Sequence, residues 1–204
     1  MARRWPFFLM ATLSVLVAIG SWRFLILGLD LSFPDFDDHI DLRPLPFIVH
    51  VSLAPAALVL GLFQFMPRLR AKRPAIHRAT GRLYVLCVGT SGLAGLWLSL
   101  FAPGGPVAGV GFGALALLWI SVTGVAVAHA INRNIPAHRA WMIRSFALTL
   151  AGVTLRLYLG GILLSGGGYT EASPWLAWLC WVPNIIVAEW WIARERARHM
   201  SVRN

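Results

Sequence analysis

The chain has 204 residues, of which 58% are hydrophobic and 13% are charged, and its mean hydropathy is +0.69. A soluble domain carries about 25% charged residues, so this sequence cannot cover a water-facing surface and needs lipid around it. The formal net charge of +10 does not indicate nucleic-acid binding, because the basic residues lie in short loops between apolar segments. Composition therefore predicts an integral membrane protein without a nucleic-acid partner.

Six apolar segments are each long enough to cross a bilayer, which takes about 20 residues per helix. They are expected to form an all-α bundle, a single integral membrane domain over residues 1–204, with helices at about 7–29, 45–66, 81–102, 107–131, 140–164 and 174–193. The first segment is too long for a signal-peptide core, so it is predicted to remain as a helix. Cys87 and Cys180 lie in apolar segments, where neither a disulfide nor a zinc site is expected.

The distribution of charge predicts the orientation of these helices. Fifteen of the 18 basic residues lie at the termini and in or beside the second and fourth connections, whereas six of the eight acids lie on the opposite side. The positive-inside rule places the basic side in the cytoplasm. We therefore predict cytoplasmic N- and C-termini, a multi-pass location in a bacterial inner membrane, and anionic phospholipid head groups at the cytoplasmic loops.

Two connections carry related sequences, Pro-Ala-Ile-His-Arg-Ala at 74–79 and Pro-Ala-His-Arg-Ala at 136–140. Each is predicted to open the following helix, since proline fits a first helical turn. Helix pairs 2–3 and 4–5 are therefore a candidate parallel repeat about an axis along the membrane normal. Helical geometry also places residues at offsets of 7, 11, 14 and 18 on one stripe, which we expect to face the bundle axis. The stripes are His77, Tyr84, Val88, Ser91 and Gly95 in one helix, and His138, Ser145, Thr149, Gly152 and Arg156 in the other.

Arg156 lies inside the fifth apolar segment, and an intramembrane arginine indicates a functional site unless an ion pair compensates it. Such a charge needs a carboxylate, a group of buried carbonyls or the anionic group of a cofactor. Glu189 is the only acid within a segment, and a structural ion pair is its expected role. The candidate partners of Glu189 are Arg144, His77 and His138.

Three other polar residues have simpler expected roles. Asn184 follows Pro183, and it is expected either to bond a backbone carbonyl freed by the proline or to line a site. His39 and His199 lie in aqueous segments and are expected to be surface residues.

The remaining histidines permit a cofactor. A bis-histidine b-type haem needs two neutral imidazoles at one depth on different helices, and His77, His138 and His129 share the inner layer. His50 and Arg156, in the outer layer, suit a quinone or a haem propionate, and Arg144 is a further cofactor-binding candidate. The alternative is that the two His-Arg pairs open helices whose N-termini bind phospholipid head groups. No catalytic triad, P-loop, HExxH motif or nucleotide fingerprint is present.

Several segments resemble a family of bacterial membrane proteins known as domain of unknown function 2306. They are His77-Arg78-Ala79-Thr80-Gly81-Arg82-Leu83-Tyr84, His138-Arg139-Ala140-Trp141-Met142-Ile143-Arg144-Ser145, Thr154-Leu155-Arg156-Leu157-Tyr158, and Asn184 through Glu189-Trp190. The resemblance runs from about Pro46 to Trp191 and implies a multi-helix membrane protein, with no activity attached. The histidine-bearing helix pairs are also similar in architecture to cytochrome b561 and the ferric-reductase class of membrane haem proteins, without a shared motif.

Three functional hypotheses follow, and the sequence does not decide whether the protein is an enzyme. The first is a redox module that binds b-type haem or quinone among the second to fifth helices. The second is a transporter of an anion or small molecule in which Arg156 binds the substrate. The third is an accessory or assembly subunit of a larger membrane complex, with some of the ten tryptophans facing a partner.

Overall fold

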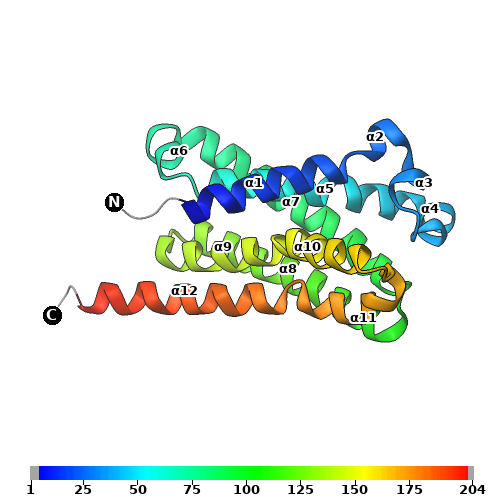
Figure 1. Ribbon diagram of the computed structural model, residues 1–204. Coiled ribbons are helices and arrows are strands. Elements are labelled where there is room, and N and C mark those ends of the chain that lie inside the picture. Colours follow the sequence, from blue (N-terminus) through cyan, green and yellow to red (C-terminus); the bar gives the residue numbers. More distant parts are fainter. Residues whose placement is uncertain (1–4, 202–204) are drawn as a thin grey trace.

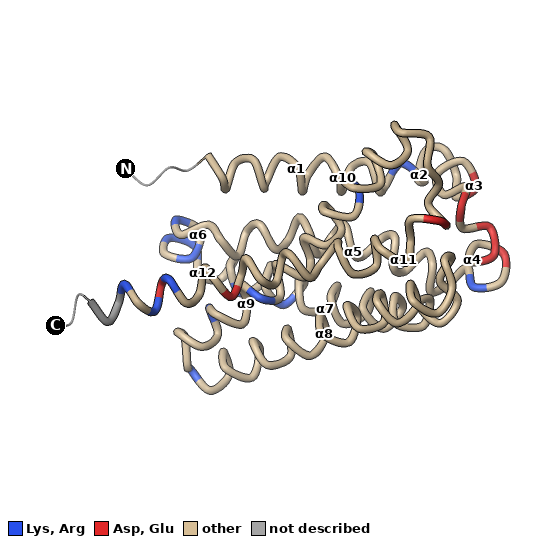
Figure 2. The backbone as a smooth tube through the Cα atoms, turned by 60° about the horizontal axis from the view of Figure 1, so that its bottom comes forward, with Lys and Arg blue, Asp and Glu red and all other residues tan. Residues whose placement is uncertain are grey.

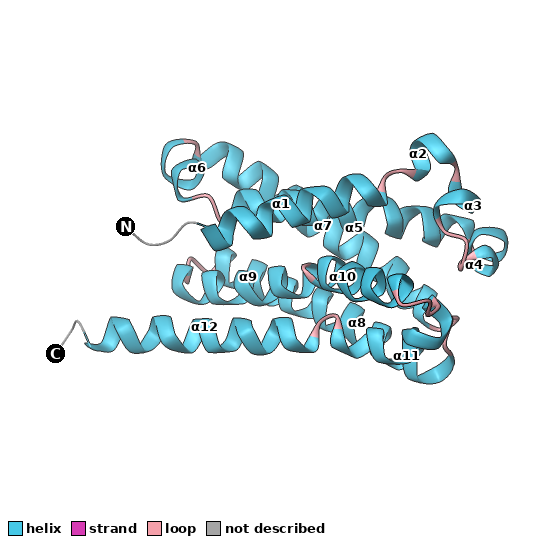
Figure 3. Ribbon diagram, in the orientation of Figure 1, coloured by secondary structure: helices cyan, strands magenta, loops and turns pink. Residues whose placement is uncertain are grey.

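The chain is mostly helical in the part that the structure describes. The computed structural model describes the backbone of residues 5–201 and the side chains of residues 5–198, and it contains no strand in that range (Figures 1 and 3). The all-α prediction is therefore confirmed. In chain order the helices are α1 (Trp5–Ser21), α2 (Phe24–Leu27), α3 (Leu29–Ser32), α4 (Asp37–Leu42), α5 (Pro44–Gln64), α6 (Pro67–Lys72), α7 (Pro74–Ser99), α8 (Gly105–Ile131), α9 (Ile135–Thr149), α10 (Ala151–Leu164), α11 (Tyr169–Leu179) and α12 (Val182–Ser201).

Six helical stretches in the described residues are long and apolar enough to cross a bilayer, which confirms that prediction. They are Trp5–Leu27, Pro44–Gln64, Pro74–Ser99, Gly105–Ile131, Ile135–Leu164 and Tyr169–Arg198. Large apolar side chains cover their outward faces, including Leu25, Ile26 and Leu164. A surface of this kind is stable among acyl chains and not in water, so the protein is a multi-pass membrane protein.

Several helix boundaries differ from the prediction, and two of them have identifiable reasons. Helix α7 begins at Pro74 rather than near residue 81, because the proline occupies the first helical turn and polar residues continue the helix beyond its apolar part. Helix α1 ends at Ser21 rather than near residue 29. Directly after this end, Trp22 donates a hydrogen bond to the Ser52 carbonyl of α5 (2.9 Å). Gly28, with φ of 79°, then separates α2 from α3.

The last two membrane-crossing stretches are each broken near mid-length. The first is interrupted at Leu150, between α9 and α10, and the second at Cys180 and Trp181, between α11 and α12 (Figure 3). The second break has a direct cause, because Pro183 lacks the amide hydrogen that would continue the helical ladder. The sequence foresaw the break at Pro183 but not the break at Leu150.

Charge is separated along the bundle, as Figure 2 shows. Basic residues gather at the end formed by α6 and the C-terminal part of α12, and most acidic residues lie around α3 and α4 at the opposite end. We call the basic end the inner end and the acidic end the outer end. The cytoplasmic placement of the inner end stays a prediction. Arg3, Arg4, His199 and Arg203 lie outside the described side chains.

The helices pack through small residues at close approaches. Helix α5 packs along α7, and α8 packs on both α7 and α9. A Cβ atom at Gly61 of α5 would overlap the Phe146 ring and lie 3.2 Å from Cε2 of Tyr84, so glycine lets both rings into the interior. Cys87 and Cys180 are buried and unpaired, as expected. The internal repeat of helix pairs stays a prediction.

His39 is buried, and its prediction as a surface residue was wrong. The side chain is 3% exposed, and its ring stacks between Phe36 and Phe47 at centroid distances of 5.9 and 6.1 Å. Its Nδ1 atom has no hydrogen-bond partner among the described residues. Desolvation by this burial, followed by the nearby Arg43 charge, lowers the pKa of His39, while Asp38 acts in the opposite direction. The sequence missed this because the aromatic residues around His39 come from two separate elements.

The lowered pKa of His39 predicts a loss of stability in acid. The unfolded chain takes up the proton at its ordinary pKa of about 6.5, whereas the folded chain resists protonation. Stability from the neutral ring is therefore present above that pH and decreases as the pH falls below it. We expect melting temperatures measured between pH 7.5 and 5 to fall more steeply for the wild type than for His39→Gln. Equal slopes would contradict this assignment.

Candidate functional site

A buried network of hydroxyl groups joins α7, α8 and α9 near the middle of the bundle. The Tyr84 hydroxyl lies 2.7 Å from Ser145 Oγ and 2.8 Å from Thr149 Oγ1. Ser145 Oγ also lies 2.7 Å from Thr123 Oγ1, and Trp119 Nε1 donates to Thr149 Oγ1 at 2.9 Å. All five side chains are buried. The expectation that the two stripes face the bundle axis is confirmed at this level.

The network closes the bundle axis. Each hydroxyl has one proton, so with Thr149 donating to the Ser145 carbonyl (2.9 Å) and Thr123 donating to the Trp119 carbonyl (2.7 Å), Thr149 accepts from Tyr84 and Thr123 accepts from Ser145. Tyr84 is 0% exposed and, with Phe146, fills the space that Gly61 leaves open. This level is a packed, fully bonded layer between an inner and an outer group of polar residues.

In the outer half, His50 of α5 contacts α7. Its Nδ1 atom lies 3.0 Å from the Ser91 carbonyl oxygen and 3.2 Å from Ser91 Oγ. A carbonyl only accepts, so this contact assigns the ring proton to Nδ1 and leaves Nε2 as an acceptor. A Cβ atom at Gly95 would lie 2.9 Å from both Cε1 and Nδ1 of the ring, so this glycine makes room for the imidazole.

Arg156 of α10 points toward the middle of the membrane. Its Nη1 donates to the Gly152 carbonyl at 3.0 Å, one turn back toward the inner end. The guanidinium is close enough to Arg23 and Tyr169 to interact electrostatically with both, and it interacts in the same way with His50. Within the described residues, no carboxylate forms an ion pair with Arg156.

Arg23 was not foreseen as part of this outer group. It follows α1, donates to the carbonyls of Gly20 (3.0 Å) and Ser32, and lies over the Phe33 ring. A signal was available, since Arg23 is one of the three basic residues, with Arg43 and Arg156, that do not follow the charge bias. Charges that break this rule need another reason for their position.

At the inner end, His77 and His138 lie near each other at the first turns of α7 and α9. His138 Nδ1 lies 2.8 Å from the Ala126 carbonyl, and it interacts electrostatically with His77. Nδ1 of His77 is buried without a hydrogen-bond partner in the described part of the chain. His129 is partly exposed near the end of α8. Over residues 5–198, no group of three or more His, Cys, Asp or Glu side chains is arranged to bind a metal ion.

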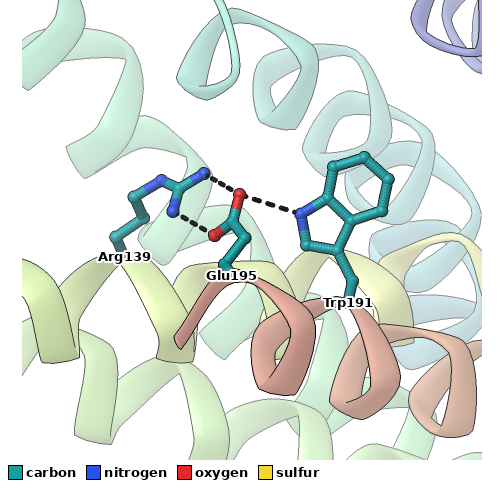
Figure 4. A network of polar contacts seen from close by, with 3 residues as sticks. All are labelled: Arg139, Trp191 and Glu195. Atoms are coloured by element: carbon teal, nitrogen blue, oxygen red, sulfur yellow. Dashed lines mark hydrogen bonds and ion pairs between the residues drawn. The ribbon is translucent and has the colours of Figure 1, made fainter. Parts of the chain in front are cut away.

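Two other arginines of the bundle have acidic partners. Arg144 of α9 forms a two-point ion pair with Glu189 of α12, through Nε (2.5 Å) and Nη2 (2.8 Å), which confirms the ion pair expected for Glu189. One turn closer to the inner end, Arg139 forms an ion pair with Glu195 (Figure 4). Glu195 also accepts a hydrogen bond from Trp191 Nε1 at 3.0 Å. The role of Arg144 in cofactor binding stays a prediction.

Asn184 connects the two helix breaks. Its Nδ2 donates to the carbonyls of Cys180 (3.0 Å) and Ala147 (3.3 Å), and its side chain also bonds the Thr154 hydroxyl. These carbonyls lie beside the breaks in the two stretches, where the backbone ladder is interrupted. Asn184 therefore bonds a backbone carbonyl beside the break at Pro183, although the carbonyl that the proline itself leaves without a donor is that of Leu179, and the link to a second broken helix is new.

The comparison with protein families gives one match. The family model described as "Predicted membrane protein (DUF2306)" matches residues 47–192. This range contains His50, His77, Tyr84, His138 and Arg156, and it leaves out α1 and Arg23. No curated protein and no solved structure gives a significant match. The similarity to cytochrome b561 and ferric reductases stays a prediction. Because the match covers well over half of its length, the chain belongs to the DUF2306 family of membrane proteins.

Proposed function

We propose that this protein binds a small anion in the outer half of its bundle, with Arg156 as the main binding residue, and carries it across the membrane. The observation that supports this is a guanidinium inside the membrane that donates to the carbonyl of Gly152 and, among the described residues, forms no ion pair with a carboxylate. An arginine at such depth costs about 2.5–3.5 kcal/mol on insertion scales unless a partner offsets the charge. A bound anion would supply that partner.

The contrast with the other arginines strengthens the proposal. Arg139 and Arg144 each pair with a glutamate of α12. Arg156, deeper in the bundle, has no described carboxylate in an ion pair with it and is within electrostatic reach of a second positive charge, Arg23. A bound anion would offset the repulsion between these two like charges.

Basic and polar groups on both sides of the Tyr84 layer support a route for such an anion. The Arg156 group lies above the Tyr84 layer, and His77 and His138 lie below it with further basic residues around them. Broken helices beside a mid-membrane site are typical of secondary transporters, and α9–α10 and α11–α12 have breaks at this level. The Tyr84 layer would then be the closed barrier between the two sides.

The test is uptake into vesicles containing the purified protein. We expect labelled lactate, succinate or inorganic phosphate to enter faster than into protein-free vesicles, and Arg156→Gln to weaken the apparent affinity by about 30-fold or more. Arg68→Gln, an exposed arginine of α6, is the matched control and should behave as the wild type. Identical uptake by wild type and Arg156→Gln, or none above protein-free vesicles, would overturn the proposal.

A redox module that binds b-type haem or quinone is the second candidate, favoured by one contact. The Ala126 carbonyl orients His138 so that Nε2 is unprotonated, which is the form that ligates haem iron. His77 or His129 would be the second ligand, and a bound haem would supply one-electron chemistry. An absorption spectrum of the purified protein tests this, since a Soret band removed by His138→Ala supports it, and a colourless protein without extractable quinone excludes it.

We also propose that the inner end faces the cytoplasm of a bacterial cell and binds anionic phospholipid head groups. The exposed side chains of Arg68, Arg70 and Lys72 on α6 support this, because basic residues beside a membrane helix attract anionic lipid.

A further inference from the structure

We infer that a groove between α1 and α10 binds a membrane-soluble alcohol, a long hydrocarbon chain that ends in one hydroxyl group. The groove has a volume of about 320 Å³ and is distinct from the proposed anion site. Thr154 of α10 and Asn184 of α12 supply the hydroxyl and amide groups of its lining, and the other lining residues are apolar or aromatic. A ligand in this groove therefore meets hydrocarbon walls and one small polar patch.

The polar patch lies deep in the membrane. Asn184 is at the middle of the membrane-crossing stretch Tyr169–Arg198, and Thr154 is inside the stretch Ile135–Leu164. Both side chains are partly exposed and line the groove, so they are open to the lipid side of the bundle. Because water does not reach the hydrocarbon core, any further hydrogen-bond partner for this patch has to come from a lipid-soluble molecule.

The hydrogen bonds of the patch are short of hydrogens. The Asn184 amide has two hydrogens, and the carbonyls of Cys180 (3.0 Å) and Ala147 (3.3 Å) accept from them. Thr154 Oγ1 lies 3.0 Å from the same nitrogen as a third acceptor. The one hydrogen of Thr154 has two acceptors in turn, the Leu150 carbonyl (3.2 Å) and Asn184 Oδ1 (3.1 Å). Three hydrogens thus serve five acceptor atoms, and Asn184 Oδ1 has a lone pair available for a ligand.

A patch with spare acceptors and no spare hydrogen selects a ligand that donates. A hydroxyl group donates to Asn184 Oδ1, whereas an ether or aldehyde adds one more acceptor. A carboxylate or phosphate would bring a charge into a groove whose lining has no charged residue. The head group of a glycerolipid stays at the membrane surface, far from a patch at mid-depth. A hydrocarbon chain with a terminal hydroxyl meets all of these conditions.

The apolar wall of the groove fits such a chain. On α1 the wall runs from Trp5 to Leu13, which is about 12 Å at 1.5 Å per residue. With its hydroxyl at Asn184, the chain of the alcohol would lie along this wall toward the inner end.

Photo-crosslinking tests the site. A tetradecanol that carries a diazirine in its chain is added to the full-length protein in phosphatidylcholine nanodiscs, and the labelled peptides are identified by mass spectrometry. Peptides of α1 and α10 should carry the label. One hydrogen bond corresponds to roughly tenfold in affinity, so unlabelled tetradecanol should compete about tenfold better than its methyl ether, which has the same chain and no hydrogen to donate.

Variants separate the polar patch from the groove. Asn184→Leu removes the acceptor, so alcohol and ether should compete equally, whereas Thr154→Val leaves Asn184 Oδ1 free and should keep the preference for the alcohol. Because Asn184 also bonds the helix breaks, a further variant fills the groove without touching them. Leu9→Trp, at a half-exposed position of α1 that lines the groove, should abolish the labelling. Leu118→Trp, at an exposed position of α8 outside the groove, is the matched control and should label as the wild type.

The outcomes that would overturn the inference are distinct. Labelling spread evenly over the lipid-facing helices, or unchanged in Leu9→Trp, would exclude a site in this groove. Equal competition by tetradecanol and its methyl ether in the wild type would exclude an alcohol as the ligand. A dimer in light scattering that Leu9→Trp separates would show that a second copy of this chain covers the groove instead. None of these measurements involves an anion, so their failure would leave the proposed site at Arg156 in place.

Discussion

Replacing Arg156 by methionine is expected to stabilise the protein by about 2 kcal/mol while abolishing anion binding. The reason is that the guanidinium carries its charge inside the membrane and pairs with no carboxylate in the part of the chain that the structure describes. Methionine keeps most of the apolar stem and removes the charge, so packing around α10 should change little. The melting temperature in detergent without added anion should rise by several degrees, and uptake of labelled lactate into vesicles should be lost.

The same substitution at a paired arginine provides the control. Arg144→Met leaves the carboxylate of Glu189 without its partner, so stability should fall or stay constant there. A lower melting temperature for Arg156→Met than for the wild type would show that the arginine is compensated within the protein, and the proposal of an anion site would lose its energetic basis.

Replacing Tyr84 by alanine is expected to destabilise the bundle by about 3–5 kcal/mol, the largest effect among the residues discussed. The ring is fully buried and packs where Gly61 leaves room between α5 and α7. Its removal leaves a cavity at the level where α7, α8 and α9 meet. Thermal unfolding in detergent measures the effect, and a leak of small anions through vesicles containing Tyr84→Ala would show that the ring also forms the barrier.

Phenylalanine at the same position separates the ring from its hydroxyl. Tyr84→Phe keeps the volume, and Ser145 and Thr149 retain Thr123 and Trp119 as partners. A membrane hydrogen bond contributes only about 0.6 kcal/mol, so this variant should remain close to wild-type stability. Vesicles that contain it should not leak small anions. A loss as large as that of the alanine variant would indicate that the hydroxyl network, and not the ring, stabilises this layer.

Much of the fold was accessible from the sequence because the membrane makes one property dominant. Every spanning segment needs a long apolar run, so six helices could be located from composition alone. The break at Leu150 was missed because a short interruption of backbone bonds leaves the apolar run intact, whereas Pro183 marks the other break in the sequence. For the same reason, the sequence predicted one continuous helix over about residues 7–29, whereas the structure ends α1 at Ser21 and begins α2 at Phe24.

The candidate site was predictable only where helical spacing carries the information. Ser145 and Thr149 lie on the stripe of His138, so their shared face could be inferred from their spacing. The proximity of Arg23 to Arg156 depends on how α1 crosses the bundle, and no pattern in a single chain specifies that crossing. The environment of His39 depends in the same way on contacts between elements distant in sequence.

The amide of Asn184 has a mechanical consequence for the bundle. Below it, α9 and α12 are locked together by two arginine-glutamate pairs. Above it, α10 and α11 line an outward-facing apolar groove of about 370 Å³ and have no comparable ionic lock in the described residues. Asn184 therefore lies at the boundary between an inner half held together by ion pairs and an outer half held together by apolar packing.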